Sequence, residues 1–280
     1  EVLQYSDYSH WQQQQFSGRY LQSRLSFWLK YLAGNPAKLN LPTDRPYIDN
    51  LPCDGDSISM ALDDELFVGV NALCRQWQVT PFMFYFAVFN LVLQRMTGQS
   101  DLVVGLPVAN RKNKGLDKVM GLFANAIVLR NDLSTNPPFS DFVQQVKHNA
   151  LQAFDHDQLP MLLLEQALRD INPAQYLPIF QVLFVFQNNT GELPQLEGLN
   201  LKPMPTQTRF SKRDFAFVLN ESADGVGIFV EFNAYLFDKK TIESMCNRYI
   251  ALIGEVLDNT DLPLNSYLPL KNHGHNTDDK

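Results

Sequence analysis

Apolar residues recur along the chain at two spacings, and the spacing predicts the type of each element. Residues 5–32 carry aromatic rings and leucines at helical intervals, which indicates one or two amphipathic helices closed by Gly34 and Pro36. The same interval predicts a last helix with one apolar stripe after Asp238, which we expect to cap it. Four other helices are predicted over residues 64–77, 81–97, 138–154 and 160–169.

The predicted helix 81–97 is apolar around almost its whole circumference, so we expect it to be deeply buried. Its ends are also well marked. Thr80 is a good capping residue, Pro81 suits the first helical position, and Gly98 follows the last turn. This helix should therefore lie at the centre of the core.

Shorter apolar runs predict strands. The run 180–187 is apolar on both faces, which indicates a central strand covered on both sides. A hairpin is predicted where Ser-Ala-Asp-Gly joins two of the strands. The predicted strands cover residues 57–62, 101–108, 122–130, 180–187, 214–221 and 226–237.

Helices and strands interleave without strict alternation, so the fold class we expect is α/β of the α+β kind, a mixed β-sheet with helices packed on it. Residues 39–56 contain three prolines and little periodicity, which predicts an extended surface connection.

Composition excludes several classes of function. The 280 residues carry a net charge of −7, which argues against a nucleic-acid-binding surface. The longest apolar run is interrupted by Asn90 and is shorter than the roughly 18 residues of a membrane span. The three cysteines are far apart and odd in number, which favours reduced thiols in a cytoplasmic protein.

No catalytic set can be assembled from the residues alone. The chain has no phosphate loop, no Gly-x-Ser-x-Gly turn and no His-Glu-x-x-His pair, and its five histidines predict no metal site. His156 has acidic neighbours on both sides, which fits either a turn residue or a general base. The basic loop at Arg111, Lys112, Lys114 and Lys118 fits either a solvated loop or a site for an acidic partner.

The order of several short segments is more specific than any one of them. The chain contains YSDYSHWQ (5–12), LPTDRP (41–46), TPFMFYFAVFNLVLQRMTGQSDLVVGLPVANR (80–111), GLFANAIVLRNDLS (121–134), HDQLP (156–160), PIFQVLFVFQN (178–188) and FNAYLFD (232–238). Together they resemble the condensation domains of nonribosomal peptide synthetases, over nearly all of the chain.

This resemblance implies a lobe like that of chloramphenicol acetyltransferase, one of two with a tunnel between them. Two carrier proteins would insert phosphopantetheine arms, and an acceptor amine would attack the donor thioester. The family's catalytic HHxxxDG motif lies upstream of the YSDYSHWQ segment, and no His-His pair occurs in this chain. The resemblance therefore implies a C-terminal lobe with no catalytic residue of its own and no directly bound cofactor. Its parts would be a helical segment leading from the upstream lobe (1–36), the lobe itself (37–270) and a flexible tail (271–280).

The matching motifs also suggest site residues. The expected substrate-channel residues are Asn110, Arg111, Asn125, His156 and Gln187. For Asn110 and Arg111 the alternative is that they only satisfy loop carbonyls. Lys112 and Lys114 are expected to help dock a carrier protein.

The chain departs from the family pattern at some of these motifs. Ala126 replaces a usual threonine, and Leu162 replaces a usual glutamate. The residues 175–178 also differ from the family's Ser-Arg-Asn-Pro. These departures concern substrate handling more than the fold.

Partners implied by the resemblance are carrier proteins, the N-terminal lobe and adjacent synthetase modules, without nucleic acid or membrane. Two alternatives remain open. One is a docking module that performs no chemistry. The other is a lobe of a related epimerisation, heterocyclisation or acyltransferase domain.

Overall fold

The computed structural model describes residues 3–34, 36–172, 179–188, 196, 198–199, 209–222 and 225–267. The predicted flexible tail and the departure at 175–178 lie outside these residues. The helices are α1 (Tyr5–Gln15), α2 (Gly18–Tyr31), α3 (Asp64–Trp77), α4 (Pro81–Thr97), α5 (Phe139–Phe154), α6 (Met161–Ile171) and α7 (Lys239–Asp258). The strands are β1 (Gly55–Ala61), β2 (Asp101–Val108), β3 (Asn125–Asp132), β4 (Val182–Gln187), β5 (Phe215–Ser222) and β6 (Gly225–Asn233).

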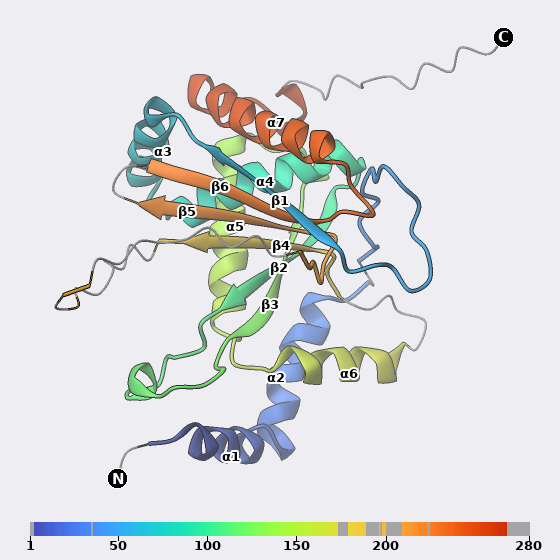
Figure 1. The fold of residues 1–280 in the computed structure, drawn as a ribbon, viewed down its shortest axis with the longest axis vertical. Helices are drawn as coiled ribbons and strands as arrows, with labels where there is room; N and C mark the ends of the chain where they lie inside the picture. Colours follow the sequence, from blue (N-terminus) through green and yellow to red (C-terminus); the bar gives the residue numbers. More distant parts are fainter. Residues whose placement is uncertain are drawn as a thin grey trace.

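The six strands form one mixed sheet in the order β1-β6-β5-β4-β2-β3 (Figure 1). Strands β2, β4 and β5 run parallel, and the other neighbouring pairs are antiparallel. The predicted α/β class with a mixed sheet is confirmed. Because parallel strands end at the same edge of a sheet, the segments after β2 and β4 emerge side by side.

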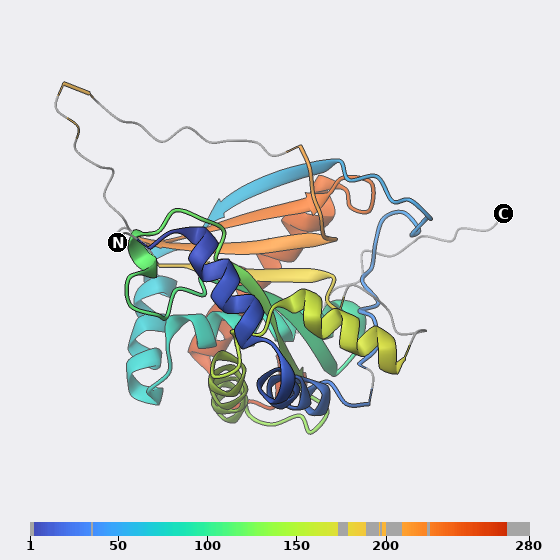
Figure 2. The same ribbon diagram turned by 90° about the horizontal axis from the view of Figure 1, so that it is seen from below.

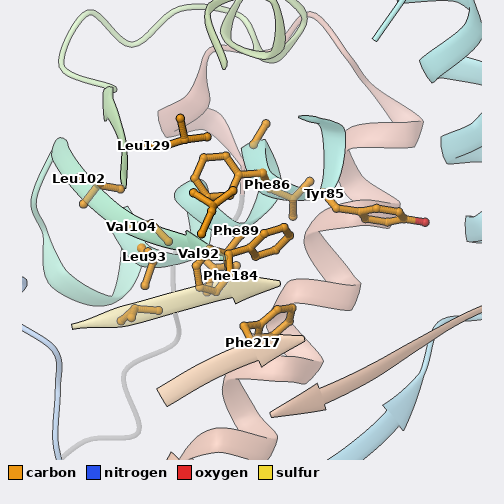
Figure 3. Packing of buried hydrophobic residues seen from close by; sticks show 14 of the residues in the cluster. Tyr85, Phe86, Phe89, Val92, Leu93, Leu102, Val104, Leu129, Phe184 and Phe217 are labelled. Carbon is orange, nitrogen blue, oxygen red and sulfur yellow. The ribbon is translucent and has the colours of Figure 1, made fainter. Parts of the chain in front are cut away.

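Helix α4 lies in the core, as predicted. Thr80 accepts a hydrogen bond from the Met83 amide at 3.3 Å, and Gly98 ends the helix in the left-handed conformation. The Phe89 ring lies 5.1 Å from that of Phe184 on β4 and 5.0 Å from that of Phe217 on β5 (Figure 3). These three buried rings join the helix to the centre of the sheet.

The prediction that β4 is covered on both faces is wrong for one face. Val182 and Phe184 are fully buried, whereas Leu183 and Val185 are only half-buried. Helices α3, α4, α5 and α7 pack together on the fully buried side (Figure 2). Apolar residues on both faces of a strand therefore did not mean equal cover on both faces.

Two predicted strands differ from the observed ones by three residues or more at one end. Residues 122–124 precede β3 without joining the sheet, because the Leu122 carbonyl bonds Tyr5 and Phe123 packs into a separate small cluster. Strand β6 stops at Asn233, because this side chain accepts the amides of Tyr235 and Leu236 and turns the chain.

The cap of α7 also differs from expectation. Asp238 occupies the N-cap position, but its side chain makes no capping hydrogen bond. The Asp44 carboxylate instead accepts the Asp238 amide at 2.7 Å and the Thr241 hydroxyl at 2.8 Å. Arg45 pairs with the Asp238 carboxylate at 2.6 Å. The LPTDRP segment thus fixes the start of a distant helix.

The connection before β1 was predicted to run along the surface, but part of it is buried. Leu39 and Leu41 are buried, and Tyr47 donates a 2.5 Å hydrogen bond to the Asp214 carboxylate. The buried Gln181 donates to the same carboxylate at 2.9 Å. This polar network fastens the connection to the starts of β4 and β5.

Within the described residues, no single helix has both the length and the hydropathy needed to cross a membrane. Helices α3 and α4 pass that test only as a pair, and the bend between them is 108°.

Candidate functional site

The sequence-predicted residues gather at the edge of the sheet where β2 and β4 end. Asn110 and Arg111 follow β2, and Asn125 begins β3 directly opposite Val108. Gln187 is the exposed last residue of β4, which pairs with β2 through Gly105 and Leu183. The fold therefore brings together motifs that are distant in the sequence. Asn110 and Gln187, for example, are 77 residues apart (187 minus 110).

Arg111 organises the loop between β2 and β3, residues 109–124. Its guanidinium donates hydrogen bonds to the carbonyls of Leu116, Val119 (2.9 Å) and Gly121 (3.3 Å). It also lies 4.1 Å from the centre of the Phe123 ring, a cation–π distance. Arg111 thus holds the loop together from the inside, which is the loop-carbonyl alternative of the sequence analysis.

Helix α1 fastens this loop through its Tyr-x-x-Tyr spacing. Asn110 has a φ of 52° and donates to the Tyr8 hydroxyl at 3.0 Å. Tyr5 donates to the Leu122 carbonyl at 2.8 Å. Tyr8 is buried against Phe123, with 4.6 Å between ring centres, and burial raises its pKa. We call Tyr5, Tyr8, Phe123 and the loop 109–124 the loop clasp.

Asn125 connects the clasp edge to the turn between α5 and α6. Its amide nitrogen donates to the carbonyls of Asp157 (2.9 Å) and Leu159 (2.7 Å). Its amide oxygen accepts the Met161 backbone amide at 3.1 Å. One side chain therefore satisfies three backbone groups, which leaves little freedom to the turn.

His156 in this turn is held by packing. Its ring stacks on Phe27 at 3.6 Å between centres and 8° between planes. The ring Nδ1 lies 3.0 Å from the Gln152 carbonyl oxygen, and the His156 carbonyl accepts the Trp28 indole N–H at 3.2 Å. Such contacts match a positioning residue of the turn better than a mobile general base.

Lys112 ties the loop to the same turn. Its ammonium group contacts the Asp157 carboxylate at 2.8 Å and donates to the Phe154 carbonyl at 2.7 Å. Asp157 is buried, and its second oxygen has no hydrogen-bond partner in the described structure. Lys112 is thus already engaged within the chain, whereas Lys114 is exposed.

Two large apolar side chains are exposed on the outer side of the loop, beside its charged residues. Met120 is 93% exposed and Leu122 is 77% exposed, although the loop that carries them is firmly held. Solvent-exposed apolar side chains on a well-held backbone are typical of a surface that contacts another protein or domain.

An apolar groove with a volume of about 490 Å³ lies at the same edge of the sheet. It lies between the start of α4, the end of α5 and the ends of β2 and β4. Its lining residues are Thr80, Pro81, Phe82, Met83, Leu106, Pro107, Leu151, Phe154, Phe184, Phe186 and Asn188. None of these side chains is ionisable. The site therefore combines a rigid polar edge of the sheet with an apolar groove whose named lining residues carry no charge.

Sequence reasoning missed Tyr8 and Asp157 as members of this site. The three-residue interval from Tyr5 to Tyr8 places both rings on one helix face, a signal that was available. The partner of Asp157 lies 45 residues away (157 minus 112), and no local pattern marks that pair. The described residues contain no group of three or more His, Cys, Asp or Glu side chains suited to a metal ion.

Comparison with known proteins gives a consistent result. A family model described as "Condensation domain" matches residues 1–275. A linear gramicidin synthase of Brevibacillus parabrevis is 35% identical over 270 residues, which are 96% of this chain but 5% of that protein. Among solved structures, the X-domain from teicoplanin biosynthesis has a TM-score of 0.85 at 22% identity, covering 94% of this chain and 61% of that one. A four-domain nonribosomal peptide synthetase bound to AMP and glycine has a TM-score of 0.81 at 20% identity, over 90% of this chain and 20% of that one.

Proposed function

This chain belongs to the condensation-domain family of nonribosomal peptide synthetases, and from that premise we propose that it is the C-terminal lobe of such a domain. In this role it contributes to amide-bond formation between two carrier-bound thioesters. The acceptor amine attacks the donor carbonyl, a C–N bond forms, and the C–S bond breaks. The amine loses a proton to a base, and the departing thiolate gains one.

The convergence of the loop clasp, Asn125 and the apolar groove at one sheet edge supports this proposal most strongly. A rigid edge of this kind can position a long flexible substrate arm without taking part in the bond changes. The phosphopantetheine arms are therefore carried substrates here and not cofactors resident in this chain.

We infer that the base comes from a second lobe. These 280 residues contain no His-His pair, and His156 is fixed by stacking on Phe27. The exposed Met120 and Leu122 give that lobe an apolar surface to contact.

The test is peptide-bond formation with two loaded carrier proteins, followed by mass spectrometry of the product thioester. We expect product when this chain is mixed with an upstream lobe bearing the HHxxxDG motif, and none from either lobe alone. Loaded carriers without any lobe provide the background rate. Turnover by this chain alone would show that the division into lobes is wrong.

A further inference from the structure

We propose that the apolar groove is a specificity pocket that takes a large uncharged side chain or acyl chain of the carried substrate. The inference rests on the proposed function for the identity of the substrate. The binding site itself follows from the lining residues and the volume.

The residues that line the groove favour an uncharged, apolar ligand. Phe82 lies close to three other lining rings, with distances between ring centres of 5.8 Å to Phe154, 6.0 Å to Phe184 and 6.4 Å to Phe186. Among the described residues of the lining, polar side chains occur only at Thr80 and Asn188. A charged group placed there would lose its hydration without gaining a counter-ion. The groove is therefore complementary in charge to a neutral occupant.

The size of the groove limits the occupant to one small group. About 490 Å³ falls within the range of small-molecule pockets and is too small for a helix with its side chains. An aromatic side chain or a medium-length acyl chain fits this volume. An acetyl group leaves most of it empty and forgoes the apolar contact.

The groove also continues into the candidate site. Leu106 and Pro107 line it, and the same strand leads three residues later into Asn110. Asn188 lines it directly after Gln187. A substrate arm that crosses this edge can therefore place its terminal group in the groove.

The experiment measures binding to this chain alone, so it needs no catalysis. The probes are pantetheine amides, stable in place of thioesters, that carry a 3-phenylpropanoyl, an acetyl or a succinyl group. Calorimetry should show that the acetyl and succinyl probes bind at least about tenfold more weakly than the phenylpropanoyl probe. Binding of the aromatic probe should also show a negative heat-capacity change.

Leu151 and Val68 lie on exposed helix surfaces and provide a pair of variants. Leu151 lines the groove and is 50% exposed, so Leu151→Trp should partly fill the groove and leave the fold intact. Val68 on α3 is 65% exposed and is not among the lining residues, so Val68→Trp is the control. We expect Leu151→Trp to weaken the aromatic probe at least about tenfold, with no change for Val68→Trp.

Three results would overturn the pocket: equal binding of the three probes, equal effects of the two tryptophans, or no binding by a chain that light scattering shows to be monomeric. A dimer that Leu151→Trp dissociates would show instead that a second copy covers the groove, which also rejects the proposal. Selective binding without peptide-bond formation by the combined lobes would contradict the proposed function and leave the pocket in place.

Discussion

The helix-and-sheet core and the loop clasp are stabilised in different ways. In the core, the fully buried Phe89 of α4 packs against the fully buried Phe184 and Phe217 of the sheet. The clasp has a separate apolar cluster of four buried residues, Tyr8, Leu116, Val119 and Phe123, and depends on hydrogen bonds from a few polar side chains. Burial of large apolar area stabilises the whole fold, whereas point contacts fix the geometry of one loop. Stability and positioning are therefore assigned to different residues in this molecule.

The largest expected effect comes from the core. Phe89→Ala should lower the free energy of unfolding by about 3–5 kcal/mol, because it removes a fully buried ring and leaves a cavity. Urea unfolding followed by circular dichroism measures this change. Leu162→Ala on the exposed face of α6 is the control and should change it by less than about 0.5 kcal/mol. A similar loss in both variants would contradict the assignment of the core.

Alkaline pH should also act mainly through the core. Burial raises the pKa of the Cys74 and Cys246 thiols to about 12. The folded chain therefore keeps protons that the unfolded chain releases above about pH 8.5, so stability is complete below that pH and falls as pH rises toward 12. The decrease should reach up to about 1.4 kcal/mol per pH unit for each thiol.

Urea midpoints between pH 8 and pH 11 measure this decrease. The exposed Cys53 serves as an internal comparison, because it should react with a thiol reagent in the folded chain while the two buried thiols do not. A midpoint that does not move over this range is the opposing result.

Asn125 connects the two regions and should give an intermediate effect. Asn125→Ala leaves two carbonyls and one amide of the 157–161 turn without their side-chain partner, which we expect to cost about 1–3 kcal/mol. Asn125→Asp keeps the acceptor for Met161 and loses the donor, so it separates the two contributions. The free energies of unfolding of the unchanged chain, Asn125→Ala and Asn125→Asp measure these contributions. Identical values would mean that the hydrogen bonds of Asn125 do not stabilise the fold.

Within the clasp, Arg111 should affect local order more than global stability. Arg111→Ala removes three loop-carbonyl bonds, so amide hydrogen exchange across residues 109–124 should accelerate. Global stability should fall by only about 1 kcal/mol. Arg111→Lys keeps the charge but not the fork of donors, and should exchange nearly as fast as the alanine variant. Unchanged exchange in both variants would show that Arg111 does not hold the loop.

The smallest expected effect is on carrier docking at Lys114. This side chain is exposed, whereas Lys112 already contacts Asp157. Lys114→Glu should weaken carrier affinity a few-fold at low salt and less at high salt, because exposed charges are screened. Lys118→Glu is a charge-matched comparison on the same loop. An effect that is independent of salt would argue against an electrostatic role.

The sequence predicted the core far better than the clasp, for a physical reason. The caps Thr80 and Gly98 and the apolar circumference of α4 are local signals, and both proved correct. The Asp44 contact with α7 and the Tyr47–Asp214 bond join segments more than 160 residues apart. The periodicity of apolar residues does not predict such pairs, because a polar side chain can contact a partner on any element that the fold brings near. The ordered motifs indicated residues that the fold gathers at one edge of the sheet, but they did not show that Arg111 and His156 have structural contacts there.

Amide hydrogen exchange of this chain, alone and mixed with an upstream HHxxxDG lobe, tests most directly whether the clasp edge is built to meet a second lobe. We predict that mixing the two lobes protects residues 109–124 around Met120 and Leu122, while exchange in α4 and α7 stays unchanged. No protection at this loop, or protection confined to the far end of the sheet, would contradict it.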